Sequence, residues 1–203
     1  MNYLAHAYLS FYQPEILVGN MISDFVKGNK KFNYPPLILA GIHLHRAIDQ
    51  FTDQHPSTSR LKEVFRPSYR LYSGAFADVA YDHFLANDPS QFPDEQLFAF
   101  SQWVYQTLGG YIEIFPDKFR GMYPYMKQQN WLYNYRLRSG MEQSFGGLVR
   151  RAAYLTESDT AFHLFEEHYD TIAACYQSFF PDVKEYALQQ LQLIQPGINM
   201  NKL

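Results

Sequence analysis

The chain has 203 residues, which is enough for one domain with a sizeable hydrophobic core. Hydrophobic residues make up 47% of the sequence, a share typical of globular proteins that argues against an intrinsically disordered chain. The formal net charge is only −3, so the composition as a whole makes no case for nucleic-acid binding.

The sequence indicates no targeting signal and no disulfide bond. The first residues, MNYLAHAYLSF, lack the basic and apolar regions of a secretory signal. No stretch approaches the roughly 18 apolar residues of a membrane-spanning helix. Cys175 is the single cysteine, so no disulfide can form within the chain. We therefore expect a cytoplasmic protein that acts without a membrane or a nucleic acid.

Prolines divide the sequence into helix-sized segments, and apolar spacing predicts a helix in each. No segment alternates like a β-strand, and no Asn-Gly or Asp-Gly pair predicts a hairpin. The expected fold is all-α: a single-domain bundle of about eight to ten helices over residues 1–203. In chain order, we expect helices over residues 14–26, 36–54, 56–65, 73–87, 94–115, 117–138, 141–153 and 158–178.

The helix expected over residues 36–54 carries ionisable groups on its apolar face. At about 100° per residue, His45 and Asp49 point to the same side as the isoleucines, whereas His43 and Arg46 point away. A carboxylate on that side must be paired, hydrogen-bonded or bound to a metal, because an isolated buried charge is very costly. The pattern predicts either a metal or catalytic site, or a His–Asp hydrogen bond that only tethers helices.

The helix expected over residues 73–87 repeats the four-residue spacing with Asp78 and Asp82. Taken alone, this pair could be a solvated face, and His83 a histidine satisfied within the core. Combined with the first helix, two carboxylates on one face are suitable ligands for a hard cation.

Two further segments add candidate ligands. Within GNMISDFVKG, Asn20 and Asp24 are four residues apart, and Lys27 follows at a neighbouring angle. Asp24 could complete a metal shell and Lys27 could contact a phosphate, although capping or surface roles are commoner for such residues. His6 is a further possible imidazole ligand.

Mixed histidine and carboxylate ligands favour Mn²⁺, Mg²⁺, Fe²⁺ or Zn²⁺ over a thiolate zinc site. Such an ion can polarise a phosphoryl oxygen and lower the pKa of bound water, and nearby basic groups can stabilise developing charge. The residue types therefore fit metal-assisted phosphoester hydrolysis. The sequence has no Gly-rich phosphate loop, no GxSxG elbow and no activating neighbour for Cys175.

Five blocks connect these candidates to a known family. They are MNYLAH, GNMISDFVKG, PPLILAGIHLHRAIDQFTD, DVAYDHFL and WLYNYR, in this order over most of the first two-thirds of the chain. The ordered set resembles the acyl carrier protein phosphodiesterase family, a divergent relative of HD-type metal phosphohydrolases. The resemblance implies an HD-like fold and hydrolysis of the phosphodiester between 4′-phosphopantetheine and a serine of holo-acyl carrier protein. It also implies a divalent cation, Mn²⁺ foremost, with Mg²⁺ or Fe²⁺ as alternatives.

The ligand roles of HD proteins cannot be copied onto this chain. The common HD pattern has adjacent His and Asp, whereas His45 and Asp49 are separated by three residues and Asp82–His83 is reversed. At the positions that match the family's blocks, we expect four carboxylates and one histidine to be metal ligands. We expect the other histidines and two basic residues to be catalytic or to transfer protons. The metal set is Asp24, His45, Asp49, Asp78 and Asp82; the catalytic set is His6, His43, His83, Arg46 and Lys27.

Charge is unevenly distributed along the chain. Residues 27–70 contain eight basic and three acidic side chains. This excess fits either solvated helix faces or a surface for an acidic partner. Because carrier proteins of this kind are acidic, the resemblance makes the region a docking surface, with Lys30, Lys31 and Arg66 as expected contacts.

Two other functions fit the same residues. The protein could be an HD-like metal phosphohydrolase of nucleotides or other small phosphoesters, or a non-catalytic helical binding module. The polar cluster of the C-terminal third is expected to be a solvated face. Its members are His163, Glu166, Glu167, His168 and Asp170.

Overall fold

A computed structural model describes residues 1–196 of the chain. These residues form eleven α-helices and four short 3₁₀ helices, with no strand among them, so the predicted all-α class is confirmed. Two of the α-helices are very short, which accounts for the excess over the eight to ten expected. The elements are α1 Tyr3–Tyr8, α2 Pro14–Ile22, η1 Ser23–Phe25, η2 Gly28–Asn33, α3 Pro36–Gln54, α4 Pro56–Tyr69, η3 Arg70–Tyr72, α5 Ser73–Ala86, α6 Gln96–Gly109, η4 Ile112–Ile114, α7 Asp117–Gln128, α8 Trp131–Asn134, α9 Arg138–Arg151, α10 Asp159–Glu167 and α11 Tyr169–Ile194.

Several expected helices are divided or shifted. The predicted 117–138 helix is wrong, because Asn130 adopts a left-handed conformation (φ 46°) and separates α7 from α8. The predicted 158–178 helix breaks at His168, and its second part continues through Pro181 to Ile194. Phe179, Val183 and other apolar residues on either side of Pro181 are buried, so packing of this face outweighs the hydrogen bond that proline removes.

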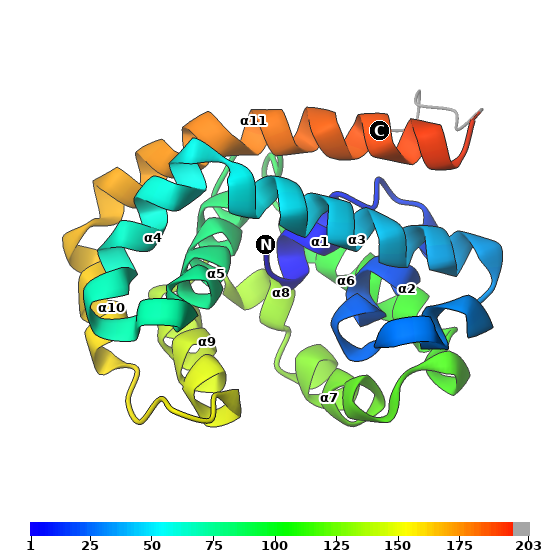
Figure 1. Cartoon of the computed structure of the whole chain (residues 1–203), viewed down its shortest axis with the longest axis horizontal. Helices are drawn as coiled ribbons and strands as arrows, with labels where there is room; N and C mark the ends of the chain where they lie inside the picture. The colour runs from blue at the N-terminus through cyan, green and yellow to red at the C-terminus, as the bar shows by residue number, and fades with distance from the viewer. Residues whose placement is uncertain (197–203) are drawn as a thin grey trace.

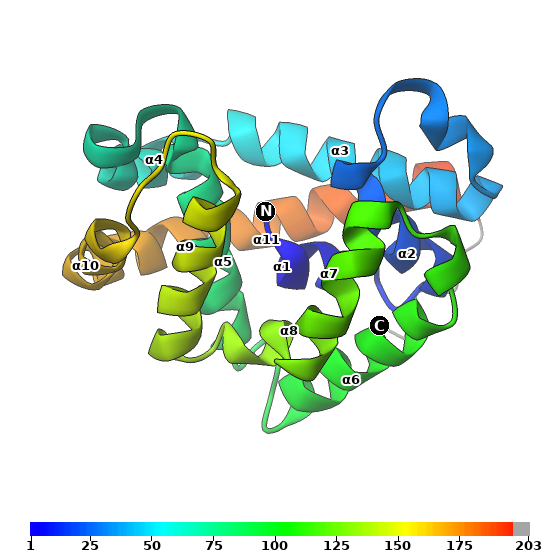
Figure 2. The ribbon, with the colours of Figure 1, turned by 90° about the horizontal axis from the view of Figure 1, so that it is seen from below.

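The longest helix, α11, runs along one side of the molecule, and α3 and α4 pack against it (Figure 1). The amino terminus and α1 lie near the middle of the molecule, with α9 and α5 to one side and α7 to the other (Figure 2). Apolar side chains from nearly all helices form the core. No helix within residues 1–196 combines the length and the apolar character needed to cross a membrane.

A pair of glycines brings α2 and α3 unusually close together. A Cβ atom at Gly19 would lie 2.0 Å from the carbonyl oxygen of Ile38, and one at Gly41 would lie 2.2 Å from that of Ile16. Neither helix could therefore carry a larger residue at the crossing without moving away. The crossing sets Asn20 of α2 beside His45 of α3, where the candidate site begins.

Candidate metal centre

Two buried histidines and a carboxylate come together from α1 and α3. Nε2 of His6 is 3.1 Å from Oδ1 of Asp49, and Nε2 of His45 is 3.1 Å from Oδ2 of the same carboxylate. The two imidazole rings are stacked with centroids 3.9 Å apart. One ligand atom from each of these three residues lies within 4.8 Å of the other two, a spacing that a single metal ion can bridge.

Asn20 fixes how both imidazoles are oriented. Its side-chain oxygen accepts a hydrogen bond from Nδ1 of His6 at 2.8 Å, and its backbone carbonyl accepts one from Nδ1 of His45 at 2.8 Å. The Asn20 amide nitrogen donates to the carbonyl of His6 and the hydroxyl of Ser10, which determines which side-chain atom is the oxygen. Both Nδ1 atoms therefore carry a proton, and both Nε2 atoms face Asp49.

This hydrogen bonding makes the site suitable for a metal ion. A neutral imidazole that donates from Nδ1 has a lone pair on Nε2, and that lone pair would face a negatively charged oxygen of Asp49. Such a contact is unfavourable unless a positive charge lies between the atoms, either as a proton on the ring or as a bound cation. Metal-binding histidines commonly donate their other N–H to an oxygen, as His6 and His45 do here. The donor set thus fits Mn²⁺ or a similar divalent cation.

The two histidines differ in their affinity for a proton. Burial, together with the charge of His45, lowers the pKa of His6 to about 4. Burial also acts to lower the pKa of His45, but hydrogen bonds to Asp24 and Asp49 outweigh it and raise that pKa to about 9. Burial alone would raise the pKa of Asp49; the two histidines and the amino group of Met1 hold it well below its usual range. Without a metal ion, His45 therefore carries the positive charge of the cluster.

Asp24 and Asp78 flank the cluster on its open side. Oδ1 of Asp24 lies 3.0 Å from Nε2 of His45, and this carboxylate is 66% exposed. Its hydrogen bond to His45 lowers the pKa of Asp24. Oδ1 of Asp78 lies 3.0 Å from the buried amino group of Met1, which is also 3.5 Å from Oδ1 of Asp49. Asp78 thus belongs to the same network of charges but does not touch either histidine in it.

Asp82 contacts the start of α1, the helix that carries His6. It is fully buried, and its two oxygens accept the backbone N–H groups of Leu4 at 2.7 Å and Ala5 at 3.1 Å. These donors belong to the first turn of α1, where a helix has no internal acceptors for its N–H groups. Burial raises the pKa of Asp82 to about 7, although the two N–H donors favour its charged form. Asp82 therefore anchors α1, and through it His6.

Three further candidates lie away from the cluster. His83 is buried between the carbonyl of Tyr135 and the hydroxyl of Tyr169, and burial lowers its pKa to about 4. His43 is exposed on the outer face of α3. Arg46 donates to the carbonyl of Val26 at 3.0 Å and so holds the segment that follows Asp24.

A cleft of about 1100 Å³ opens beside the cluster. Asp24, Asp78 and the start of the chain form part of its wall, and α7 and α9 supply the opposite parts. Four basic side chains reach it: Lys27, Lys30, Lys118 and Arg151. The lining also contains three carboxylates, Asp24, Asp78 and Asp117, so the basic groups give the cleft a small positive excess that an anion can meet.

The sequence does not predict how several residues of this site contribute. It indicates His6 only as a further possible ligand, because nothing in the sequence brings α1 to α3. It treated Asn20 only as a neighbour of Asp24, although Asn20 contacts both histidines. Lys118 and Arg151 come from distant helices, and only the fold brings them to the cleft. The block MNYLAH was the one sequence signal that pointed to His6.

The fold and the site together define an all-α protein with a histidine–carboxylate cluster beside a basic cleft. A family model described as acyl carrier protein phosphodiesterase matches residues 1–183. The chain belongs to this family.

Curated relatives of the same description are similar over nearly their whole lengths. An acyl carrier protein phosphodiesterase of Escherichia coli O6:H1 is 32% identical over 188 residues, covering 92% of this chain and 97% of the relative. One from Salmonella paratyphi A is 31% identical over 191 residues, 94% and 99% of the two chains. One from Photorhabdus laumondii is 32% identical over 188 residues, 92% and 95%. No solved structure matches the chain.

Proposed function

We propose that this protein hydrolyses the phosphodiester that joins 4′-phosphopantetheine to a serine of holo-acyl carrier protein. Family membership supports the reaction. The cluster of His6, His45 and Asp49 supports placing the reaction at this site. The Nε2 atoms and the carboxylate converge there, while oxygen atoms of Asn20 accept hydrogen bonds from both Nδ1 atoms.

These three residues would hold a divalent cation, Mn²⁺ foremost, with Mg²⁺ or Fe²⁺ as alternatives. Such a cation, when bound, polarises a phosphoryl oxygen and lowers the pKa of water. The requirement for a cation and its identity are part of the proposal.

Other side chains of the chain would position water, accept its proton and neutralise charge on the phosphate. Asp24 is exposed beside His45, so its carboxylate can orient a water molecule and accept its proton. Lys27 and Arg151 line the cleft and neutralise charge on the phosphate oxygens. Water adds to phosphorus, the bond from phosphorus to the serine oxygen breaks, and that oxygen takes up a proton. The products are apo-carrier protein and 4′-phosphopantetheine.

The substrate protein would approach from the open side of the cleft. Lys30 and Lys118 are exposed there, and an acidic carrier protein complements their charge. The cytoplasm is the expected compartment, since the single cysteine indicates no dependence on disulfide bonds.

Mass spectrometry of holo-acyl carrier protein tests the proposal. Incubation with the protein and Mn²⁺, Mg²⁺ or Fe²⁺ should remove the mass of 4′-phosphopantetheine. Asp49→Asn should slow the loss by more than about 100-fold. Asp53→Asn is a matched control, because Asp53 is on the same helix and pairs with Lys62 outside the cluster. An unchanged carrier mass with all three metals would overturn the proposed reaction.

A further inference from the structure

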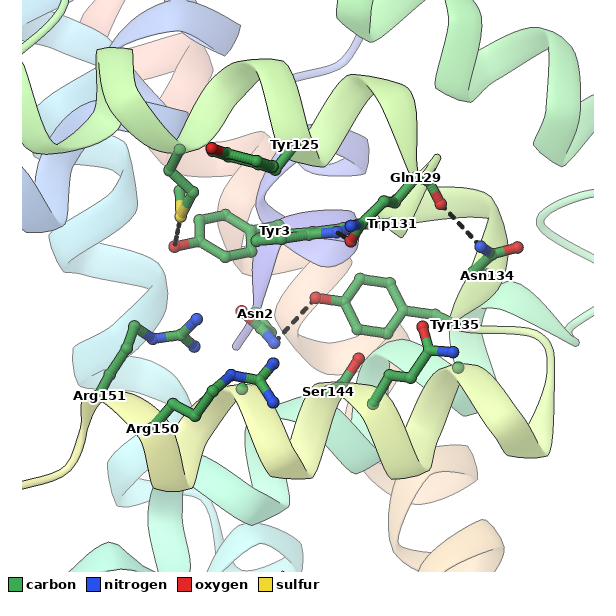
Figure 3. A pocket seen from close by; sticks show the side chains of 14 residues that line it. Asn2, Tyr3, Tyr125, Gln129, Trp131, Asn134, Tyr135, Ser144, Arg150 and Arg151 are labelled. Carbon is green, nitrogen blue, oxygen red and sulfur yellow. Dashed lines mark hydrogen bonds between the residues drawn. The ribbon is translucent and has the colours of Figure 1, made fainter.

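A second cavity of about 650 Å³ lies next to the cleft, between α9 and the segment that joins α7 to α8 (Figure 3). Side chains of Asn2, Tyr3, Trp131 and Tyr135 point into it from one side, and Arg150 and Arg151 reach up from α9. Its volume is in the range of cavities that hold small organic ligands.

The two cavities adjoin each other. They share five wall residues, which are Asn2, Tyr3, Met122, Trp131 and Arg151. Arg151 is therefore placed where the basic cleft meets the second cavity. Among residues 1–196, neither Arg150 nor Arg151 forms an ion pair with a carboxylate, so both guanidinium groups can meet an anionic ligand.

The wall of the second cavity suits a long, neutral chain with alternating apolar and amide groups. Tyr3 and Trp131 supply aromatic surface, with ring centroids 6.4 Å apart. Side-chain amides and a hydroxyl supply hydrogen-bonding groups; they are Asn2, Gln129, Asn134, Gln143 and Ser144. Ser144 and Gly147 of α9 also line the cavity, and their small size leaves its floor open. Gly140 has a different role, because a Cβ atom there would clash with the carbonyl oxygen of Asn134.

We propose that this cavity binds the pantetheine arm of the substrate during hydrolysis, an inference that rests on the proposed function. The phosphate lies at Arg151, beside Asp24 and Asp78, and the arm extends past Tyr3 and Trp131 toward Ser144. The dimethyl group of the arm contacts the aromatic rings, and its two amides meet the side-chain amides. The carrier serine remains on the cleft side, near Lys30 and Lys118.

Filling the cavity tests the proposal. Ser144→Leu places a larger apolar side chain in the cavity, while Ser139→Leu places the same side chain on an exposed part of α9. Each variant and the wild type would cleave holo-carrier protein and a carrier protein whose phosphoserine carries only a methyl ester. Both substrates release the same serine oxygen, so they differ only in the arm.

The wild type and Ser139→Leu should prefer the full arm by at least about tenfold in kcat/KM. Ser144→Leu should lose most of that preference while cleaving the methyl ester as the wild type does. Equal preference in Ser144→Leu and wild type would overturn the arm site and leave the proposed reaction intact.

Fluorescence provides a readout that needs neither turnover nor metal. The chain has two tryptophans, so Trp103→Phe leaves Trp131 in the cavity as the single reporter. Titration of the metal-free protein with 4′-phosphopantetheine should change Trp131 emission saturably, and Ser144→Leu should weaken binding at least about tenfold. A flat titration would overturn the arm site. If neither carrier substrate is cleaved, the proposed reaction fails, and this titration alone decides the cavity's ligand.

Discussion

His6 and His45 reach the same carboxylate from different helices. The sequence placed His45 and Asp49 on an inward helix face, because a four-residue spacing determines which side chains share a face. It could not reveal that His6 stacks on His45, or that Asn20 accepts a hydrogen bond from each ring. Those contacts join residues from three helices, and helical periodicity carries no information about them.

The different pKa values of the histidines predict a proton count for metal binding. At pH 7.5, His45 is protonated because its pKa is raised to about 9, whereas His6 is neutral because its pKa is lowered to about 4. Binding of Mn²⁺ to both Nε2 atoms should therefore release about one proton, and affinity should increase as pH rises toward 9. Calorimetric titrations in buffers of different ionisation enthalpy measure this number. Release of no proton would show that His45 is not a ligand.

Among the elements, α3 was predicted accurately and α1 was not. Pro36 and a long amphipathic pattern fix the bounds Pro36–Gln54. Helix α1 has only six residues, too few for a periodic pattern, and depends on Asp82 of α5 to accept its first N–H groups. Breaks at Asn130 and His168 were also missed, since neither residue is a strong helix breaker by itself.

The anchoring of α1 can be tested at Asp82. Asp82→Asn keeps the shape of the side chain but replaces one acceptor oxygen with an NH₂ group facing a backbone donor. We expect the free energy of unfolding to fall by about 1–3 kcal/mol and Mn²⁺ affinity to fall as His6 shifts. Asp159→Asn, in the exposed first turn of α10, should cost only a few tenths of a kcal/mol. Denaturant titration of both variants would refute the anchoring role if their losses were equal.

The close crossing of α2 and α3 can be tested at Gly41. Gly41→Ala must push α2 away, because its Cβ would lie 2.2 Å from a backbone oxygen, and we expect a loss of about 1–3 kcal/mol in unfolding free energy. Gly121→Ala has nothing within 4 Å and should instead stabilise α7 by up to about 1 kcal/mol. Chemical denaturation of the pair checks both signs. A Gly41→Ala protein as stable as the wild type would contradict the close crossing.

In the folded molecule, the basic residues of the 27–70 region do not form one surface. Lys30 lines the cleft beside the candidate centre. Arg66 lines a separate hollow with Lys62 and Arg70, and it pairs with Glu63 at 2.8 Å. A count of charges along residues 27–70 cannot distinguish the two positions, because helix packing decides which basic residues share a face of the molecule.

This division predicts which charge reversals affect substrate binding. Lys30→Glu should raise KM for holo-carrier protein about tenfold at low salt with little change in kcat, since the charge steers and holds an acidic partner. Arg66→Glu is the matched reversal in the separate hollow and should leave KM close to that of the wild type. Steady-state kinetics at two salt concentrations would measure both. A larger effect at Arg66 than at Lys30 would move the docking surface away from the cleft.

We propose that His6, His45 and Asp49 together hold the divalent cation. The most direct measurement is an anomalous difference map from crystals of the Mn²⁺-loaded protein, recorded on both sides of the manganese absorption edge. We expect one strong peak about 2.0–2.3 Å from Nε2 of His6, Nε2 of His45 and a carboxylate oxygen of Asp49. A Mn²⁺ peak elsewhere, for example at the exposed cluster of His163, Glu166 and Asp170, with none between the two imidazoles, would contradict it.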